Sequence, residues 1–200
     1  MKIVTVLMLS CLLAQPALAA GGGPAGDPDL IGIYLDDAGE SFCSEVVPTG
    51  FLTAYLVLTG LTSPSIGGWE AKVTFTGGGL LTNVAYVGLA INAATRTNEY
   101  IVGLGEPLVA DQGTLAVMSM TLYIFDTLVV THGFVGPVYY NSIEGVELPC
   151  YLDGDDMELI KPLYPSLGTI DEPVLILNDK CSGPVANTPS SWGDLKSLYR

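Results

Sequence analysis

The hydrophobic residues of this chain fall in short runs that glycine and proline separate. In the clearest run, 68–76, Trp69, Val73 and Phe75 alternate with polar side chains. A period of two is typical of a β-strand with one buried and one solvated face. We therefore predict that 68–76 is a strand and that Trp69 faces the core.

Nine or ten strand-like runs follow one another, and no helical stripe of apolar residues interrupts them. The runs are 30–35, 51–59, 68–76, 80–91, 100–104, 114–125, 128–135, 146–152, 158–163 and 174–177. Many short strands with Gly and Pro turns predict an all-β fold, a two-layer antiparallel β-sandwich of the Ig-like jelly-roll kind. Runs 114–125 and 128–135 flank Asp126-Thr127 and are expected to form a hairpin.

The first residues have the order of a secretory signal. Lys2 precedes a mostly apolar run over 3–14, and Ala17-Leu18-Ala19 supplies a cleavage site. The run is shorter than the roughly 20 residues that span a bilayer, and no later segment is long and apolar enough to do so. We expect export to the cell surface or medium. The alternative is a lipoprotein signal at Cys11.

We expect four segments: a signal peptide over 1–19, a flexible leader over 20–29, the sandwich over 30–181, and a linker with a short tail over 182–200. In the tail, Trp192, Leu195 and Leu198 recur at helical spacing. A helix this short is marginal in water, so the tail needs a surface to dock on. That surface belongs either to a partner or to its own domain.

The charge balance restricts the partners. The chain has 7 Lys and Arg against 21 Asp and Glu, a formal net charge of -14. Nucleic-acid binding needs a basic footprint, which the sequence lacks. The acidity also disfavours an anionic membrane surface, and it suits an exported protein or one that binds cations.

Three cysteines follow the predicted signal: Cys43, Cys150 and Cys181. None forms a C-x-x-C pair, which argues against a zinc or redox motif. A disulfide is expected in an exported protein, and the sequence does not choose among the pairings. We favour Cys43–Cys181, because the first and last strands of a sandwich often lie close together.

The densest carboxylate group is a candidate calcium site. Asp153, Asp155, Asp156 and Glu158 offer the oxygen ligands that calcium prefers, although their spacing does not match an EF-hand. The competing interpretation is a solvated acidic turn. The segment 36–40 is a weaker version of the same pattern.

Catalytic motifs are lacking in the sequence. His132 is the only histidine, and no G-x-S-x-G motif accompanies it, so we interpret it as an ordinary strand residue. A carboxylate-dependent glycosidase stays open, because so many acids always supply some pair at the needed spacing. Four tyrosines are candidates for stacking on sugar rings: Tyr123, Tyr139, Tyr140 and Tyr151.

Two stretches resemble known proteins. The segments 55–59 and 66–75, with Gly67-Gly68-Trp69, are similar to cohesin-like and carbohydrate-binding sandwiches. The ending Trp192-Gly193-Asp194-Leu195-Lys196 resembles the Trp-Gly-x-x-Lys tail of a group of uncharacterised exported bacterial proteins. Neither resemblance implies a functional residue.

These patterns favour an exported, non-catalytic sandwich for surface association, adhesion or ligand binding, with a surface protein or a glycan as partner. The alternative is a secreted hydrolase that depends on carboxylates or calcium. A concave site with two converging buried carboxylates would favour the enzyme. A flat face or an exposed aromatic strip would favour binding.

Overall fold

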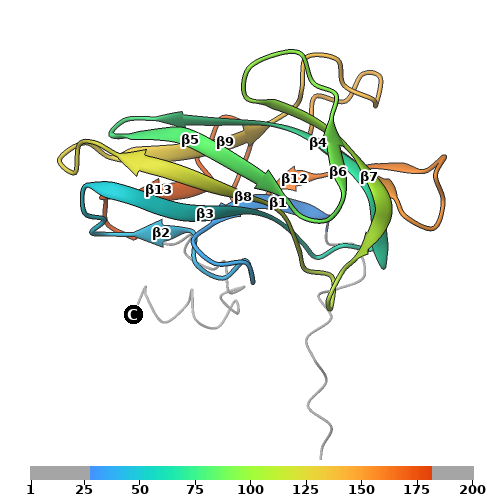
Figure 1. Ribbon diagram of the computed structural model, residues 1–200, viewed down its shortest axis with the longest axis horizontal. Helices are drawn as coiled ribbons and strands as arrows, with labels where there is room; N and C mark the ends of the chain where they lie inside the picture. Colours follow the sequence, from blue (N-terminus) through green and yellow to red (C-terminus); the bar gives the residue numbers. More distant parts are fainter. Residues whose placement is uncertain (1–27, 182–200) are drawn as a thin grey trace, which may run out of the picture.

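The computed structural model describes residues 28–181, which form a β-sandwich (Figure 1). One layer, here named sheet A, has the strand order β12-β1-β3-β8-β5. Its strands are β1 (Leu30–Tyr34), β3 (Gly50–Thr59), β5 (Gly79–Tyr86), β8 (Leu115–Ile124) and β12 (Tyr164–Pro165). The predicted all-β sandwich is therefore confirmed.

The second layer, sheet B, has the order β11-β10-β4-β9-β13-β2, and β7 joins β4 to β6. Its strands are β2 (Cys43–Ser44), β4 (Ser65–Thr76), β6 (Ala90–Asn92), β7 (Glu99–Val109), β9 (Thr131–Gly136), β10 (Cys150–Asp153), β11 (Ile160–Pro162) and β13 (Leu175–Leu177). Strand β4 is the centre of this layer because it pairs with β7, β9 and β10.

Two details differ from the sequence-based expectation. The pairs β1–β12 and β2–β13 are parallel, whereas the other pairs are antiparallel. The expected hairpin of 114–125 and 128–135 is wrong, because β8 pairs with β3 and β5 in sheet A while β9 pairs with β4 and β13 in sheet B. The chain at Asp126-Thr127 crosses between the layers. That junction lacks the glycine of a tight two-residue turn.

The core lies between the two layers and contains the residues that alternation assigned to it. Trp69 is 3% exposed, as predicted. Its ring lies 6.4 Å from the ring of Tyr86 in sheet A and 6.1 Å from that of Tyr100 in sheet B. Leu56, Val73 and Leu122 are fully buried in the same cluster. Burial of these apolar surfaces is the main force that holds the layers together.

A glycine pair lets the chain turn from β4 into β5. Gly77 has a φ of +89°, and a Cβ at Gly78 would stand 2.0 Å from the carbonyl oxygen of Asp126. Only glycine allows this close approach of two backbones. The Gly77-Gly78-Gly79 punctuation in the sequence therefore marks a packing contact as well as a turn.

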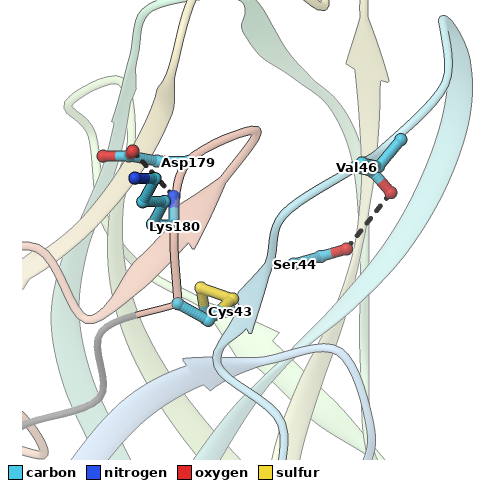
Figure 2. The surroundings of a disulfide bond; sticks show 6 residues. Cys43, Ser44, Val46, Asp179 and Lys180 are labelled. Atoms are coloured by element: carbon cyan, nitrogen blue, oxygen red, sulfur yellow. Dashed lines mark hydrogen bonds between the residues drawn. A yellow bond between two sulfur atoms is a disulfide. The ribbon is translucent and has the colours of Figure 1, made fainter.

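The disulfide joins Cys43 of β2 to Cys181, with Cα atoms 5.7 Å apart (Figure 2). The favoured pairing is confirmed, and it ties an early strand to the end of the described chain across 138 residues of sequence. Cys150 is buried and unpaired within residues 28–181. The predicted signal peptide and the tail with Trp192 lie outside the described residues. Nowhere in 28–181 is there a helix with the length and hydropathy to cross a bilayer.

Candidate functional site

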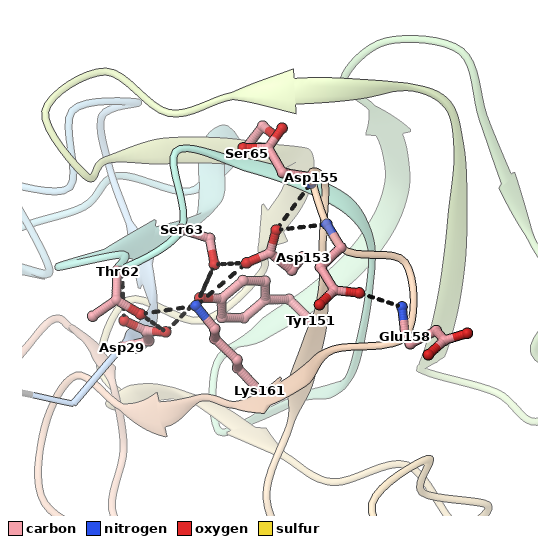
Figure 3. A network of polar contacts seen from close by, with 10 residues as sticks. Asp29, Thr62, Ser63, Ser65, Tyr151, Asp153, Asp155, Glu158 and Lys161 are labelled. Carbon is pink, nitrogen blue, oxygen red and sulfur yellow. Dashed lines mark hydrogen bonds and ion pairs between the residues drawn. The ribbon is translucent and has the colours of Figure 1, made fainter.

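The first candidate site surrounds Asp153, at the end of β10 (Figure 3). The Asp153 carboxylate accepts hydrogen bonds from the Ser63 hydroxyl at 2.5 Å and from two backbone N–H groups, those of Asp155 and Asp156. The Lys161 ammonium lies 3.3 Å from it. The Ser63 hydrogen bond, with help from these other donors, lowers the pKa of Asp153 from 3.8 to about 2. The charge of the Asp153 carboxylate is therefore balanced by Lys161, and both of its oxygens already accept hydrogen bonds.

The same network continues through Tyr151 to Asp29. The Tyr151 hydroxyl donates to Asp29 at 2.5 Å, and the Thr62 backbone N–H donates to the same carboxylate at 2.7 Å. Burial is the main cause that raises the pKa of Tyr151, and the Asp29 bond adds to it. Lys161 also donates to Ser63 at 2.6 Å. Ser63 and Lys161 are thus both engaged in contacts within this network.

The other three predicted calcium ligands are arranged differently. Asp155, Asp156 and Glu158 are exposed, and the Asp156 carboxylate accepts the backbone N–H of Glu158. Within the part of the chain that the structure describes, no three Asp, Glu, Cys or His side chains are grouped closely enough to hold a metal ion. The turn at Asp36 likewise uses its carboxylate to accept backbone N–H groups, those of Glu40 and Ser41.

A second candidate lies on the outer face of sheet B, beneath the β9–β10 loop, residues 137–149. Glu70 is 4% exposed, and its carboxylate accepts the Ser142 backbone N–H at 2.7 Å and the Ser142 hydroxyl at 2.9 Å. The Cys150 thiol donates to it at 3.2 Å. Burial, and then the Glu70 charge, raise the pKa of that thiol. Glu70 thus anchors the loop, and the thiol stays protonated and unreactive.

Two hollows open on this face of sheet B. One, of about 200 Å³, lies where Gly68 of β4 pairs with Gly103 of β7, so that side chains are missing from both strands. Leu152 and Ile160 line it, together with Glu70. The other, of about 660 Å³, lies between the β9–β10 loop and the sheet, and Glu99 lines it.

The third candidate is the outer face of sheet A. Register places Phe51, Tyr123 and Leu80 in one row across β3, β8 and β5. Their exposed fractions are 75%, 36% and 58% respectively, and the Phe51 and Tyr123 rings lie 5.1 Å apart. Beside this row, small and polar residues continue the surface. We name the whole set the open face: Phe51, Thr53, Tyr55, Leu80, Asn83, Ala85, Ser119, Thr121 and Tyr123.

The open face carries no charge. None of β1, β3, β5, β8 and β12 contains a charged residue, although the chain has 21 acidic side chains. In the junction between β8 and β9, Phe125 and Leu128 are 54% and 94% exposed. An uncharged surface with exposed aromatic and aliphatic side chains is typical of an interaction site.

The four tyrosines and the histidine considered in the sequence analysis differ in how exposed they are. Tyr123 lies on the open face, and Tyr139 and Tyr140 are 63% and 70% exposed on the β9–β10 loop. Tyr151 is fully buried, so its assignment as a sugar-stacking residue is wrong: its position on β10 opposite Trp69 turns it toward the core. His132 is a half-buried strand residue beside Phe134.

Sequence reasoning missed Ser63, Lys161, Glu70 and Glu99. The alternation in 68–76 predicts that Glu70, next to the inward-facing Trp69, lies on the solvated face of its strand, and it does lie on that face. The β9–β10 loop buries it there. Alternation reports only which side of a strand a residue occupies, and the loop that covers this side comes from 72 residues further along the chain.

Comparison with known proteins shows a limited structural similarity. A type II cohesin domain from the cellulosome of Acetivibrio cellulolyticus has 11% identity and a TM-score of 0.43, covering 76% of this chain and 96% of that domain. A type I ScaB cohesin from Pseudobacteroides cellulosolvens has 8% identity and a TM-score of 0.39, covering 78% and 96%.

A cohesin module from a Clostridium perfringens family 33 glycoside hydrolase has 13% identity and a TM-score of 0.38, covering 68% of this chain and 90% of the module. No family model and no curated protein sequence matches the chain. At these identities and TM-scores the similarity identifies neither a family nor a function.

Proposed function

We propose that this protein is an exported, non-catalytic adhesion module that binds another protein through the open face of sheet A. The observation that carries the proposal is the uncharged row of Phe51, Tyr123 and Leu80 on an otherwise acidic protein. Cores of protein interfaces are depleted of charged residues and enriched in Tyr and Phe. The open face has no charged residue and it exposes Phe51 and Tyr123, so it has both properties.

The chemistry of the partner follows from that composition. Binding here desolvates aromatic and aliphatic groups together with the hydroxyls of Thr53 and Thr121, and no charge has to leave water. The matching surface is therefore an apolar patch with a few hydrogen-bonding groups. Because the remainder of the chain is acidic, a strongly acidic partner would be repelled.

A non-catalytic role is supported by the way the titratable clusters are used. Asp153 is paired with Lys161, and Glu70 anchors the β9–β10 loop. The alternative of a carboxylate-dependent hydrolase requires a carboxyl group that is free to exchange a proton with substrate. These two groups are occupied by contacts within the protein, and among the carboxylates that line the 660 Å³ hollow only Glu99 is buried, whereas a glycosidase site needs two converging ones.

Export is supported by the Cys43–Cys181 disulfide, because disulfides persist in oxidising compartments. This agrees with the secretory pattern of residues 1–19. Attachment through Trp192, Leu195 and Leu198 stays a prediction, because the tail lies outside the described residues.

Site-specific photo-crosslinking in the cells that produce the protein tests the proposal. A photoreactive residue at Thr53 should give a discrete protein adduct, and the same residue at Thr74, on the outer face of sheet B, should not. With the partner identified and purified, Phe51→Ala should weaken binding by roughly tenfold or more, as expected of an interface anchor. Adducts of equal yield from Thr53 and Thr74, or no protein adduct from Thr53, would contradict the proposal.

A second measurement separates protein binding from membrane binding and from charge-driven adhesion. Affinity for the partner should change little between low and high salt, since no charge lies on the open face. Phosphatidylcholine vesicles should not bind. Vesicle binding that disappears in Leu128→Ser would instead identify the apolar residues near this face as a membrane contact.

Calcium binding by Asp153, Asp155, Asp156 and Glu158 also stays a prediction. A cation that binds only the native state stabilises it by about 2.7 kcal/mol at a hundredfold excess over its dissociation constant. The melting temperature should then rise with calcium in the native sequence and not in the double variant Asp155→Ala, Asp156→Ala. Equal melting temperatures in chelator and in calcium would end this prediction.

A further inference from the structure

A large cavity lies on sheet B, the other layer of the sandwich from the open face. The 660 Å³ cavity between the β9–β10 loop and sheet B is within the size range of small-molecule sites. We name it the loop cavity. Its lining includes Lys72, Arg96, Glu99, Tyr139, Asn141, Glu144 and Glu147.

The loop that forms the roof of this cavity is held in place. Ser142 is fixed to Glu70 by two hydrogen bonds. The Asn141 side chain donates to the Leu148 carbonyl at 2.6 Å and accepts the Ile143 backbone N–H at 2.9 Å. The cavity is therefore preformed, which reduces the entropic cost of binding a ligand.

Glu99 gives the loop cavity a buried acceptor. It is 7% exposed, and its Oε1 accepts the Tyr139 backbone N–H at 3.3 Å. Within residues 28–181, its Oε2 receives no hydrogen bond and no cation lies within ion-pair distance of the carboxylate. This oxygen faces the cavity, where water solvates it. A ligand that supplies O–H or N–H groups can replace that water.

The cavity offers donors as well as acceptors. The Arg96 guanidinium lies 3.4 Å from the centre of the Tyr139 ring, which fixes its position. Lys72 and the Asn141 amide add further N–H groups, while Glu144 and Glu147 add acceptors. Three glutamates outnumber Lys72 and Arg96 by one charge, so an anion would be repelled and a simple amine would be attracted only weakly. A neutral ligand whose hydroxyls both donate and accept suits all of them.

Tyr139 lines the loop cavity, and Tyr140 stands beside Tyr139 just outside that lining; both rings are exposed. Tyr139 and Tyr140 are 63% and 70% exposed, and their ring centres are 4.8 Å apart in an edge-to-face arrangement. Aromatic side chains of this kind present an apolar face beside a polar hydroxyl. The alternating C–H and O–H surfaces of a sugar ring match that combination.

We infer that the loop cavity is a carbohydrate-binding site, in which Glu99, Arg96 and Asn141 bind sugar hydroxyls and Tyr140 contacts the apolar face of a ring. It is independent of protein binding by the open face, because it lies on the other sheet. The protein thus carries a face for a protein and a pocket for a glycan.

Titration of the disulfide-bonded protein with four soluble oligosaccharides tests the site: cellotetraose, xylotetraose, maltotetraose and chitotetraose. Calorimetry should detect at least one of them with a dissociation constant below about 1 mM, and amide resonances of Arg96 and Tyr139 should shift. Glu99→Gln should weaken that binding by tenfold or more. Tyr140→Ala, at an exposed position, should weaken it severalfold without lowering the melting temperature.

Phe51→Ala is the matched control, and it should leave oligosaccharide binding unchanged. Several outcomes overturn the inference: no binding of any of the four sugars at about 10 mM, binding that survives both Glu99→Gln and Tyr140→Ala, or tighter binding of methylammonium than of every sugar. If Glu99→Gln lowers the melting temperature, Tyr140→Ala alone decides. Loss of partner binding in Phe51→Ala with sugar binding intact separates the two proposals.

Discussion

The two sheets of this sandwich share one core and present opposite exteriors. Sheet A contains no charged residue, and its outer face around Phe51 and Tyr123 is open. Sheet B contains Glu70, Lys72, Glu99, Asp153 and Lys161, and the β9–β10 loop covers part of its outer face. On sheet B, Glu70, Glu99 and Asp153 accept hydrogen bonds from loop backbone. On sheet A the lack of charge leaves a surface whose desolvation costs little free energy.

A substitution at Trp69 tests whether the two layers share a single core. Because its ring packs against Tyr86 of sheet A and Tyr100 of sheet B, Trp69→Ala should lower the free energy of unfolding by about 3–5 kcal/mol. Urea unfolding followed by circular dichroism measures the loss. A change below about 1 kcal/mol would place the ring outside the shared core.

The disulfide is expected to have the next largest effect. The Cys43–Cys181 bond closes a loop of 138 residues, so its removal by Cys43→Ser with Cys181→Ser should cost about 2–5 kcal/mol, mainly through a less restricted unfolded state. Thermal unfolding of the variant checks this. Cys150→Ser is the control, since Cys150 is not part of the bond. A variant as stable as the native protein would contradict the expectation.

One substitution on each sheet tests whether the two sheets use charge differently. Glu70→Ala leaves the Ser142 backbone N–H without its acceptor and should cost about 1–3 kcal/mol. Thr53→Asp places a charge on the open face and should change stability by less than about 1 kcal/mol. Partner binding should show the reverse order: lost in Thr53→Asp and kept in Glu70→Ala. Equal losses of stability in Glu70→Ala and Thr53→Asp would mean that charge has the same structural role on both sheets.

The smallest expected effect concerns pH. The pKa of Asp153 is lowered in the folded protein to about 2 from 3.8, so its ionised form stabilises the fold at pH above about 4. That contribution should be lost as the pH falls from about 4 to about 2. Urea unfolding across this range in native protein and in Asp153→Asn measures it. A pH dependence that is the same in both would assign the effect to other carboxyl groups.

Much of the fold was predictable because strand alternation is local. The run 68–76 placed Trp69 in the core, and the Gly and Pro punctuation located most strands. The predicted hairpin of β8 and β9 is wrong because strand pairing, unlike alternation, is not a local property. Two neighbouring runs with suitable spacing can pair with each other or enter different sheets, and only the packing of the whole domain selects between them.

Local sequence patterns are enough to establish the all-β class, the buried side of the central strand and the acidic character of a protein with few cations. Which side chains contact one another depends on the tertiary structure. The open face unites three strands that are adjacent in space in the order β3-β8-β5, and Glu99 reaches the β9–β10 loop 40 residues later. Periodicity gives the side of a strand on which a residue lies. Its neighbours on that side depend on contacts between segments distant in the chain, which no local pattern encodes.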